Sequence, residues 1–203
     1  MIVIVDYGCG NLLSVYNMIR KAGGDVLISS DLNAIDKADK IILPGVGAFD
    51  TGMGTLSKGG FAEVLYRKAM VEKVPVLGLC LGLQLMTKGS REGNLPGLGF
   101  FDAQTIGFRS SLGAEARIPM IGWKNIYPRK ESVLFNDLYE NPKFYFLHSY
   151  YVQANRPEDI LATTGLSFEY VAALEKDNLF GMQFHPEKSH KFGMVVFKNF
   201  LQL

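Results

Sequence analysis

The residue best placed to do chemistry in this sequence is Cys80, which stands between two glycines in GLCLG at 78–82. It follows the apolar run 76–79 and precedes a stretch with apolar residues at helical spacing. Flanking glycines permit the sharp strand-to-helix turn that presents a nucleophile above a sheet. Free N–H groups at the start of the helix would favour a thiolate. The pattern predicts a cysteine nucleophile, with the N–H of Leu81 as one oxyanion donor; a buried core cysteine is the alternative.

A thiolate nucleophile needs a base or cation beside it, and His185 is the best candidate among the three histidines. His185 ends the apolar run 178–184 and continues as His185-Pro186-Glu187. Proline keeps the preceding residue out of the helical region. We therefore expect an extended segment in which Glu187 lies on the same face as His185 and orients its ring. An ordinary strand-end turn with solvated side chains is the alternative.

The remaining histidines and the second cysteine are weaker candidates. His148 lies in a run of alternating aromatic residues, which favours a packed or interface histidine. His190 is expected at the surface where the last helix begins, and Cys9 is expected to be a small loop residue. No group of His, Cys, Asp and Glu has the spacing of metal ligands, so we expect neither a metal nor a cofactor.

A second glycine loop, LPGVGAF at 43–49, also follows an apolar run. A dinucleotide-binding GxGxxG pattern requires glycine where Asp50 stands, and no phosphate-binding lysine of the Walker type follows. Glycines allow a peptide plane to turn its N–H group inward. We therefore expect Val46 and Gly47 to supply the second oxyanion donor beside Leu81. A plain strand-to-helix turn is the alternative.

The elements that must position these groups alternate between strand and helix in the first half of the chain. Apolar runs predict strands at 2–5, 26–29, 40–43 and 76–79, and helical spacing predicts helices at 11–21, 61–73 and through 83–86. Beyond residue 97 the chain is rich in β-forming runs, which we expect to be antiparallel: 98–108, 117–127, 144–152, 160–164, 168–175 and 179–184. A last helix is expected at 191–203.

This order predicts an α/β fold: a mostly parallel open sheet with helices on both faces, plus an antiparallel β extension. We expect one domain, residues 1–203. The net charge is +1 with no basic cluster, which argues against nucleic-acid binding. The longest uncharged stretch, 74–87, is too short to span a membrane, and MIVIVDYG is expected to be a core strand rather than a leader. Two cysteines suit a reduced cytoplasmic setting.

Three motifs together resemble those of the class I, triad-type glutamine amidotransferases: PGVGAF at 44–49, GLCLGLQL at 78–85 and QFHPEKS at 183–189. More narrowly, DYGCGN at 6–11, IGW at 121–123 and FYFLHSYY at 144–151 resemble the family of glutaminase subunits of imidazole glycerol phosphate synthase. Members of that family release ammonia from glutamine for a (β/α)8-barrel cyclase in histidine biosynthesis. The resemblance covers essentially the whole chain.

The resemblance implies particular roles for residues of this chain. It implies a catalytic triad of Cys80, His185 and Glu187. It implies that the substrate glutamine is bound by Gly45, Gly47, Gln84, Ser149 and Tyr150. Gln84 lies four residues after Cys80 and so shares its helix face. The surface toward the barrel partner would include Asn11, Trp123, Tyr145, His148 and Lys188.

Other functions remain open at this stage. PMIGWK at 119–124 replaces the usual PHMGWN, and EGNLPGLGF at 92–100 and SHKFGM at 189–194 resemble a paralogous branch. That branch supplies ammonia, with its own barrel protein, to an ATP-dependent enzyme that amidates a bacterial surface sugar. A cysteine peptidase-like hydrolase with a related elbow and a catalytically silent flavodoxin-like binding module are hypotheses of other classes. We expect the ammonia acceptor site to lie on another chain.

Overall fold

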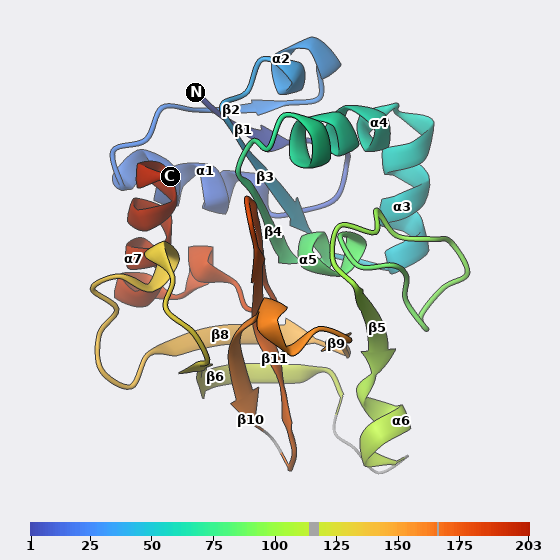
Figure 1. The fold of residues 1–203 in the computed structure, drawn as a ribbon, viewed down its shortest axis with the longest axis vertical. Helices are drawn as coiled ribbons and strands as arrows, with labels where there is room; N and C mark the ends of the chain where they lie inside the picture. The colour runs from blue at the N-terminus through green and yellow to red at the C-terminus, as the bar shows by residue number, and fades with distance from the viewer. Residues whose placement is uncertain (114–117, 166) are drawn as a thin grey trace.

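The computed structural model describes residues 1–113, 118–165 and 167–203. These residues contain an eight-stranded sheet in the order β2-β1-β3-β4-β12-β11-β10-β7 (Figure 1). The first five strands are parallel: β2 (Val26–Ser29), β1 (Ile2–Val5), β3 (Lys40–Gly45), β4 (Val76–Cys80) and β12 (Leu179–Met182). The last three are antiparallel: β11 (Glu169–Lys176), β10 (Ile160–Gly165) and β7 (Tyr127–Pro128).

Helices cover both faces of the parallel part because its strands are apolar on both faces. On one face, α2 (Leu32–Asp36), α3 (Phe49–Lys58) and α4 (Phe61–Tyr66) pack on Val3 and Val5 of β1. On the other face, α1 (Leu12–Lys21) and α7 (His190–Gln202) pack on Ile2 and Ile4. Successive residues of β1 therefore feed two separate cores, as the alternation of side chains along a strand requires.

The antiparallel extension surrounds the carboxyl ends of the parallel strands. Here β5 (Ala103–Gly107) pairs with β9 (Tyr150–Ala154), and β6 (Met120–Asn125) pairs with β8 (Lys143–His148). A bridge between Tyr145 and His185 joins β8 to the segment after β12. Figure 1 shows β8 and β6 lying across the lower end of β4 and β12, where α5 (Leu81–Leu85) begins. Short turns complete this half: α6 (Phe108–Leu112), η2 (Val133–Phe135), η3 (Pro157–Asp159) and η4 (Pro186–Lys188).

The predicted fold class is confirmed: a mostly parallel sheet, helices on both faces and an antiparallel extension. The prediction of antiparallel pairing for the run 179–184 is wrong on one side, because β12 is parallel to β4 and antiparallel to β11. The run 144–152 is two strands rather than one. Ser149 interrupts it, so β8 and β9 pair with different partners.

Three helices, α2, α3 and α6, escaped prediction, and a fourth, α4, differs from it. Helix α3 contains Gly52 and Gly54, which weaken its helical signal. Gly52 lets α3 pack closely on α5, because an added Cβ would lie 3.1 Å from the Leu85 side chain. The predicted helix 61–73 is α-helical only to Tyr66 and continues as a π-helical turn, η1 (Arg67–Val71). Residue 117 of the predicted run 117–127 lies outside the described residues. No helix of the described residues is long and apolar enough to cross a membrane.

Candidate active site

Cys80 occupies a strained turn between β4 and α5. Its backbone has φ 52° and ψ −107°, a conformation that residues with a side chain rarely adopt. The flanking glycines make the turn sterically possible. A Cβ on Gly82 would lie 1.8 Å from the carbonyl oxygen of Leu43, and one on Gly78 would lie 2.8 Å from the nitrogen of Leu83. The predicted steric role of the two glycines is therefore confirmed.

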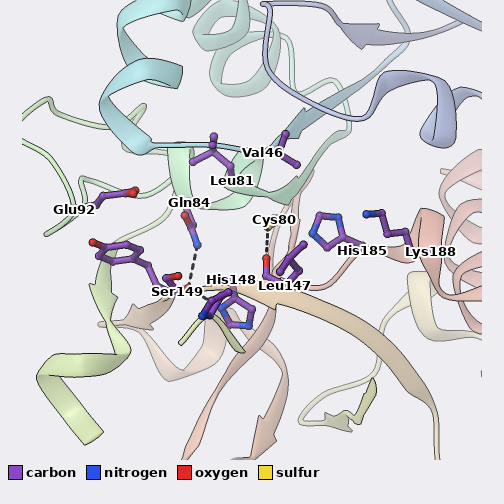
Figure 2. A pocket seen from close by; sticks show the side chains of 13 residues that line it. Val46, Cys80, Leu81, Gln84, Glu92, Leu147, His148, Ser149, His185 and Lys188 are labelled. Carbon is purple, nitrogen blue, oxygen red and sulfur yellow. Dashed lines mark hydrogen bonds between the residues drawn. The ribbon is translucent and has the colours of Figure 1, made fainter. Parts of the chain in front are cut away.

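A pocket of about 290 Å³ opens over Cys80 at the carboxyl end of the parallel strands. This edge is where open α/β sheets bind their ligands. Most of the predicted site residues line it. The complete lining is Val46, Gly47, Cys80, Leu81, Gln84, Glu92, Pro119, Leu147, His148, Ser149, Tyr150, His185 and Lys188. Figure 2 shows Glu92 at one end of the pocket, with His185 and Lys188 at the other end beside Cys80.

His185 and Glu187 form a buried pair. His185 Nδ1 lies 2.8 Å from Glu187 Oε1, and the two side chains are 4% and 3% exposed. The predicted contact is thus present, but the predicted extended segment is wrong. His185 itself is extended, with φ −103° and ψ 91°, whereas Pro186 starts the 3-10 turn η4 that folds Glu187 back toward the ring. The Ser189 hydroxyl secures this turn by donating to the carbonyl oxygen of His185 at 2.6 Å.

The surroundings of His185 favour its protonated form. Burial alone lowers its pKa, but hydrogen bonds to Cys80 and Glu187 and the negative charges of these two groups raise the pKa from 6.5 to about 10. The imidazolium at neutral pH therefore lies between a carboxylate and a sulfur atom. This arrangement stabilises an ionised sulfur and holds a proton ready for transfer.

The predicted oxyanion donors meet at the same pocket. Val46 and Gly47 are exposed on its rim, and Gly47 has φ +112°, a value that favours glycine. Leu81 is buried beside Cys80 at the first turn of α5. Gly45, which was predicted to bind the substrate, is not among the residues that line the pocket; it lies opposite Cys80 in the β3–β4 pairing. A Cβ on Gly45 would be 2.6 Å from the hydroxyl of Tyr7, so close packing requires a glycine there.

The predicted substrate residues Gln84, Ser149 and Tyr150 also line the pocket. Gln84 is buried, and its Nε2 donates to the carbonyl oxygen of Tyr150 at 3.1 Å. This bond links α5 to the start of β9 and is the dashed line that starts at Gln84 in Figure 2. Within the described part of the chain, Gln84 Oε1 accepts no hydrogen bond. A bound molecule with a donor group could use this oxygen.

Four of the five predicted partner-facing residues lie at or near the surface. Asn11 and Lys188 are exposed, Trp123 is 46% exposed and Tyr145 is half-buried. Trp123 contacts the edge of Tyr145 at 6.1 Å between ring centroids, and Lys188 Nζ lies 5.8 Å from the centre of the Tyr145 ring. His190, exposed as predicted, stacks on Trp123 at 5.5 Å. These groups form an aromatic and cationic surface next to the pocket.

The prediction for His148 needs correction, because this side chain is only 6% exposed and does not belong to that surface. It lines the pocket from within, and its Nδ1 lies 2.7 Å from the carbonyl oxygen of Tyr150. Burial lowers its pKa to about 4, against the raising effect of that hydrogen bond. His148 is therefore neutral at physiological pH and supports the wall of the pocket.

Four residues that contact the site were not predicted: Glu92, Pro119, Leu147 and Gln183. The Leu147 carbonyl oxygen lies 3.7 Å from Cys80 Sγ, and Gln183 Nε2 lies 3.8 Å from the same sulfur. Glu92 lines the pocket, and its Oε2 accepts from the N–H of Phe49 at 3.0 Å. Gln183 could have been predicted from the sequence, because it stands two residues before His185 at the end of the same apolar run. Glu92 had none, because it comes from an irregular loop. In the described residues, no group of three or more His, Cys, Asp and Glu could hold a metal ion.

Comparison with known proteins shows the family of the chain. The family described as glutamine amidotransferase class-I matches residues 3–203, and the chain belongs to this family. Among solved structures, this chain is similar to a glutamine amidotransferase with a TM-score of 0.75 and 16% identity. The alignment covers 98% of this chain and 97% of that chain. It is also similar to the PurLQS structure from Thermotoga maritima with a TM-score of 0.74 and 16% identity, and that alignment covers 99% of this chain and 97% of the other chain. At these identities the two structures show the shared fold.

Within this family, the chain is similar over its full length to several curated relatives that carry one name. The chain is 48% identical to imidazole glycerol phosphate synthase subunit HisH 2 of Methanococcus maripaludis, over 100% of this chain and 99% of that protein. It is 45% identical to the protein of the same name from Pseudomonas aeruginosa, over the full length of both. The HisH subunit of Bdellovibrio bacteriovorus is 41% identical, again over the full length of both chains.

Proposed function

We propose that this chain is the glutaminase subunit of an imidazole glycerol phosphate synthase and serves histidine biosynthesis. It hydrolyses glutamine to glutamate and ammonia and delivers the ammonia to a (β/α)8-barrel cyclase subunit. The observation that carries the proposal is the pocket lined by both Cys80 and His185, with Glu187 bonded to the His185 ring. The full-length similarity to synthase subunits supports the proposal that the ammonia goes to the cyclase subunit. We assign this function to one catalytic domain, residues 1–203, working in the cytoplasm.

The first half of the reaction forms a thioester. The Cys80 thiolate attacks the side-chain carbonyl carbon of glutamine, and the carbonyl oxygen takes the negative charge. N–H groups of Leu81 and of the Val46–Gly47 loop stabilise this oxyanion. The tetrahedral intermediate then collapses: the C–N bond breaks, the His185 imidazolium gives its proton to the departing nitrogen, and ammonia leaves.

The second half of the reaction returns the enzyme to its resting state. Neutral His185 accepts a proton from water as the water oxygen attacks the thioester carbon. The C–S bond then breaks, its electron pair returns to Cys80, and glutamate leaves. Throughout, Glu187 fixes the ring orientation of His185 through its bond to Nδ1 and stabilises the imidazolium.

The two ends of the pocket suit the two ends of glutamine. The side-chain amide belongs beside Cys80 and His185, so the α-ammonium group extends toward the opposite end of the pocket. Glu92 lies there with its carboxylate, and Gln84 offers Oε1 as a second acceptor (Figure 2). Ser149 and Tyr150 line the wall between these ends and would contact the amino acid backbone of the substrate.

Ammonia released into bulk water becomes ammonium, which is not a nucleophile, so the product requires a path that excludes water. We assign the docking surface for the barrel to Asn11, Trp123, Tyr145 and Lys188. The last of these lines the pocket as well, so the surface and the site of ammonia release are continuous. Among the relatives named above, each carries the synthase name, and the surface-sugar and peptidase alternatives have no support from them.

The proposal is tested by measuring glutamine hydrolysis with the purified chain and its barrel partner. Cys80→Ala should abolish glutamate formation, whereas the matched variant Cys9→Ala should retain it, because Cys9 lies outside the pocket lining. Tagged Cys80→Ala should also capture a barrel cyclase from the native cytoplasm. Glutamine hydrolysis by Cys80→Ala would refute the nucleophile. Capture of a barrel protein together with an ATP-dependent sugar amidotransferase would refute the histidine pathway.

A further inference from the structure

Gln183 is a fully buried polar residue that the mechanism above does not use. It follows β12 and lies between Gln84 and Cys80. Its Oε1 accepts a hydrogen bond from Gln84 Nε2 at 3.2 Å, and its Nε2 lies 3.8 Å from Cys80 Sγ. A buried amide satisfied at both ends specifies one arrangement, and here one of those ends is the nucleophilic sulfur.

The hydrogen bonds from Gln84 to Gln183 and from Gln183 to Cys80 have one possible donor–acceptor direction, which the carbonyl oxygen of Tyr150 determines. The carbonyl oxygen of Tyr150 can only accept hydrogen bonds, so the Gln84 atom 3.1 Å away must be the amide nitrogen. The same nitrogen directs its second hydrogen to Gln183 Oε1. Gln183 must therefore turn its NH2 group toward Cys80 Sγ. His148 Nδ1 donates to the same carbonyl and reinforces this anchor at 2.7 Å.

Two neighbours of the sulfur favour opposite protonation states. The Leu147 carbonyl oxygen, 3.7 Å from Cys80 Sγ, can only accept and so stabilises the thiol form. The Gln183 NH2 group, on the contrary, can only donate, and a donor binds an ionised acceptor more strongly than a neutral one. The balance between thiol and thiolate therefore depends on Gln183 as well as on His185.

We propose that Gln183 is a catalytic residue that stabilises the Cys80 thiolate, and that Gln84 is a positioning residue that holds the Gln183 amide in the donating orientation. This inference rests on the proposed role of Cys80 as the nucleophile. The N–H group stabilises the resting thiolate. It also stabilises the sulfur when water opens the thioester and the electron pair of the C–S bond returns to Sγ. Gln84 thus serves both the substrate, through Oε1, and the nucleophile, through Nε2.

The experiment measures alkylation of Cys80 by iodoacetamide as a function of pH, without glutamine, and identifies the labelled peptide by mass spectrometry. Gln183→Met keeps the volume and removes the donor. We expect its alkylation rate at neutral pH to fall roughly tenfold. The two profiles should converge at alkaline pH, where the thiol is ionised in both proteins. Gln183→Glu keeps the acceptor for Gln84 but adds a negative charge beside the sulfur, so it should react more slowly still.

The controls separate a thiolate effect from a structural one. The exposed Gln153→Met should react like the wild type. Gln84→Met should slow alkylation in the wild-type background and add nothing in Gln183→Met, because Gln84 acts through Gln183. In the wild-type chain, the side-chain amide resonance of Gln183 should shift with pH in step with alkylation, which tests the contact even where a variant fails to fold.

Three results would overturn the proposal: unchanged alkylation profiles in folded Gln183 variants, additive effects of Gln84 and Gln183, or a Gln183 amide resonance that does not follow the thiol. Because alkylation requires no turnover, it is independent of the glutaminase assay. Glutamine hydrolysis by Cys80→Ala would refute the proposed function while leaving the alkylation result intact.

Discussion

The charge of Glu187 can be separated from its position by the substitution Glu187→Gln. The two side chains have the same shape, and glutamine keeps an oxygen that accepts from His185 Nδ1, now 2.8 Å from the carboxylate. The ring should therefore keep its orientation while the negative charge disappears. Because the side chains of His185 and Glu187 are both nearly buried, solvent screens the charge of Glu187 little, and the loss of this charge should be measurable.

The magnitude follows from the kind of hydrogen bond that is lost. A hydrogen bond involving charged groups contributes about 1.5–3 kcal/mol and a neutral one about 0.5–1.5 kcal/mol. The difference of about 1–2 kcal/mol predicts that the pKa of His185 falls by roughly one unit from its value of about 10. The imidazolium that forms when His185 accepts a proton from the attacking water loses the same stabilisation, so kcat should fall about tenfold. KM should stay near the wild-type value, because Glu187 does not line the described pocket.

The raised pKa of His185 also predicts how stability depends on pH. A folded-state pKa of about 10, above the ordinary 6.5, means that the folded protein binds this proton more tightly than the unfolded chain. The resulting stabilisation is complete below about pH 6.5 and is lost as the pH rises toward 10. Glu187→Gln should flatten the decline of the unfolding free energy across this window, as urea unfolding at several pH values would show.

The assay for Glu187→Gln is steady-state glutamine hydrolysis of the assembled enzyme, combined with NMR titration of His185. Glu140→Gln, an exposed acidic residue, serves as the control and should behave like the wild type. If Glu187→Gln retains wild-type kcat and an unchanged His185 titration, the argument that this carboxylate stabilises the imidazolium is wrong.

Two further predictions concern the elbow and the docking surface. Gly82→Ala should destabilise the fold by about 3 kcal/mol or more, because its Cβ would lie 1.8 Å from the Leu43 carbonyl oxygen. Gly165→Ala is the control, because a Cβ at Gly165 would have open space. Urea unfolding compares the two variants, and equal stability would contradict the steric argument. Trp123→Ala should weaken barrel binding by about 2 kcal/mol, roughly thirtyfold in Kd, while the free chain keeps its basal glutamine hydrolysis. Tyr127→Ala, an equally exposed aromatic residue on β7, is the control in calorimetric titration, and equal affinities would place the docking surface elsewhere.

Local patterns were sufficient for the elements that carry the chemistry. The elbow at Cys80 could be predicted because its two glycines, the cysteine and the adjoining apolar run are contiguous in the chain, and the His185–Glu187 contact because the two residues lie close in the chain. Helix α3 could not be predicted, because its two glycines weaken the helical signal and the neighbour that packs against Gly52, Leu85, is distant in sequence. The η4 turn was missed because Pro186 restricts the residue before it and permits a tight turn after it.

The sequence by itself determined the class of fold and predicted Cys80 as the nucleophile and His185 as its base, since each depends on periodicity or on spacing along the chain. Only the tertiary structure decided which polar atoms meet across strands. It placed Gln183 and the Leu147 carbonyl against Cys80 Sγ, Glu92 at the far end of the pocket, and His148 inside the wall instead of on the surface. These contacts depend on how β8, β9, β12 and α5 pack at one edge of the sheet, and packing between distant segments leaves no periodic trace in sequence.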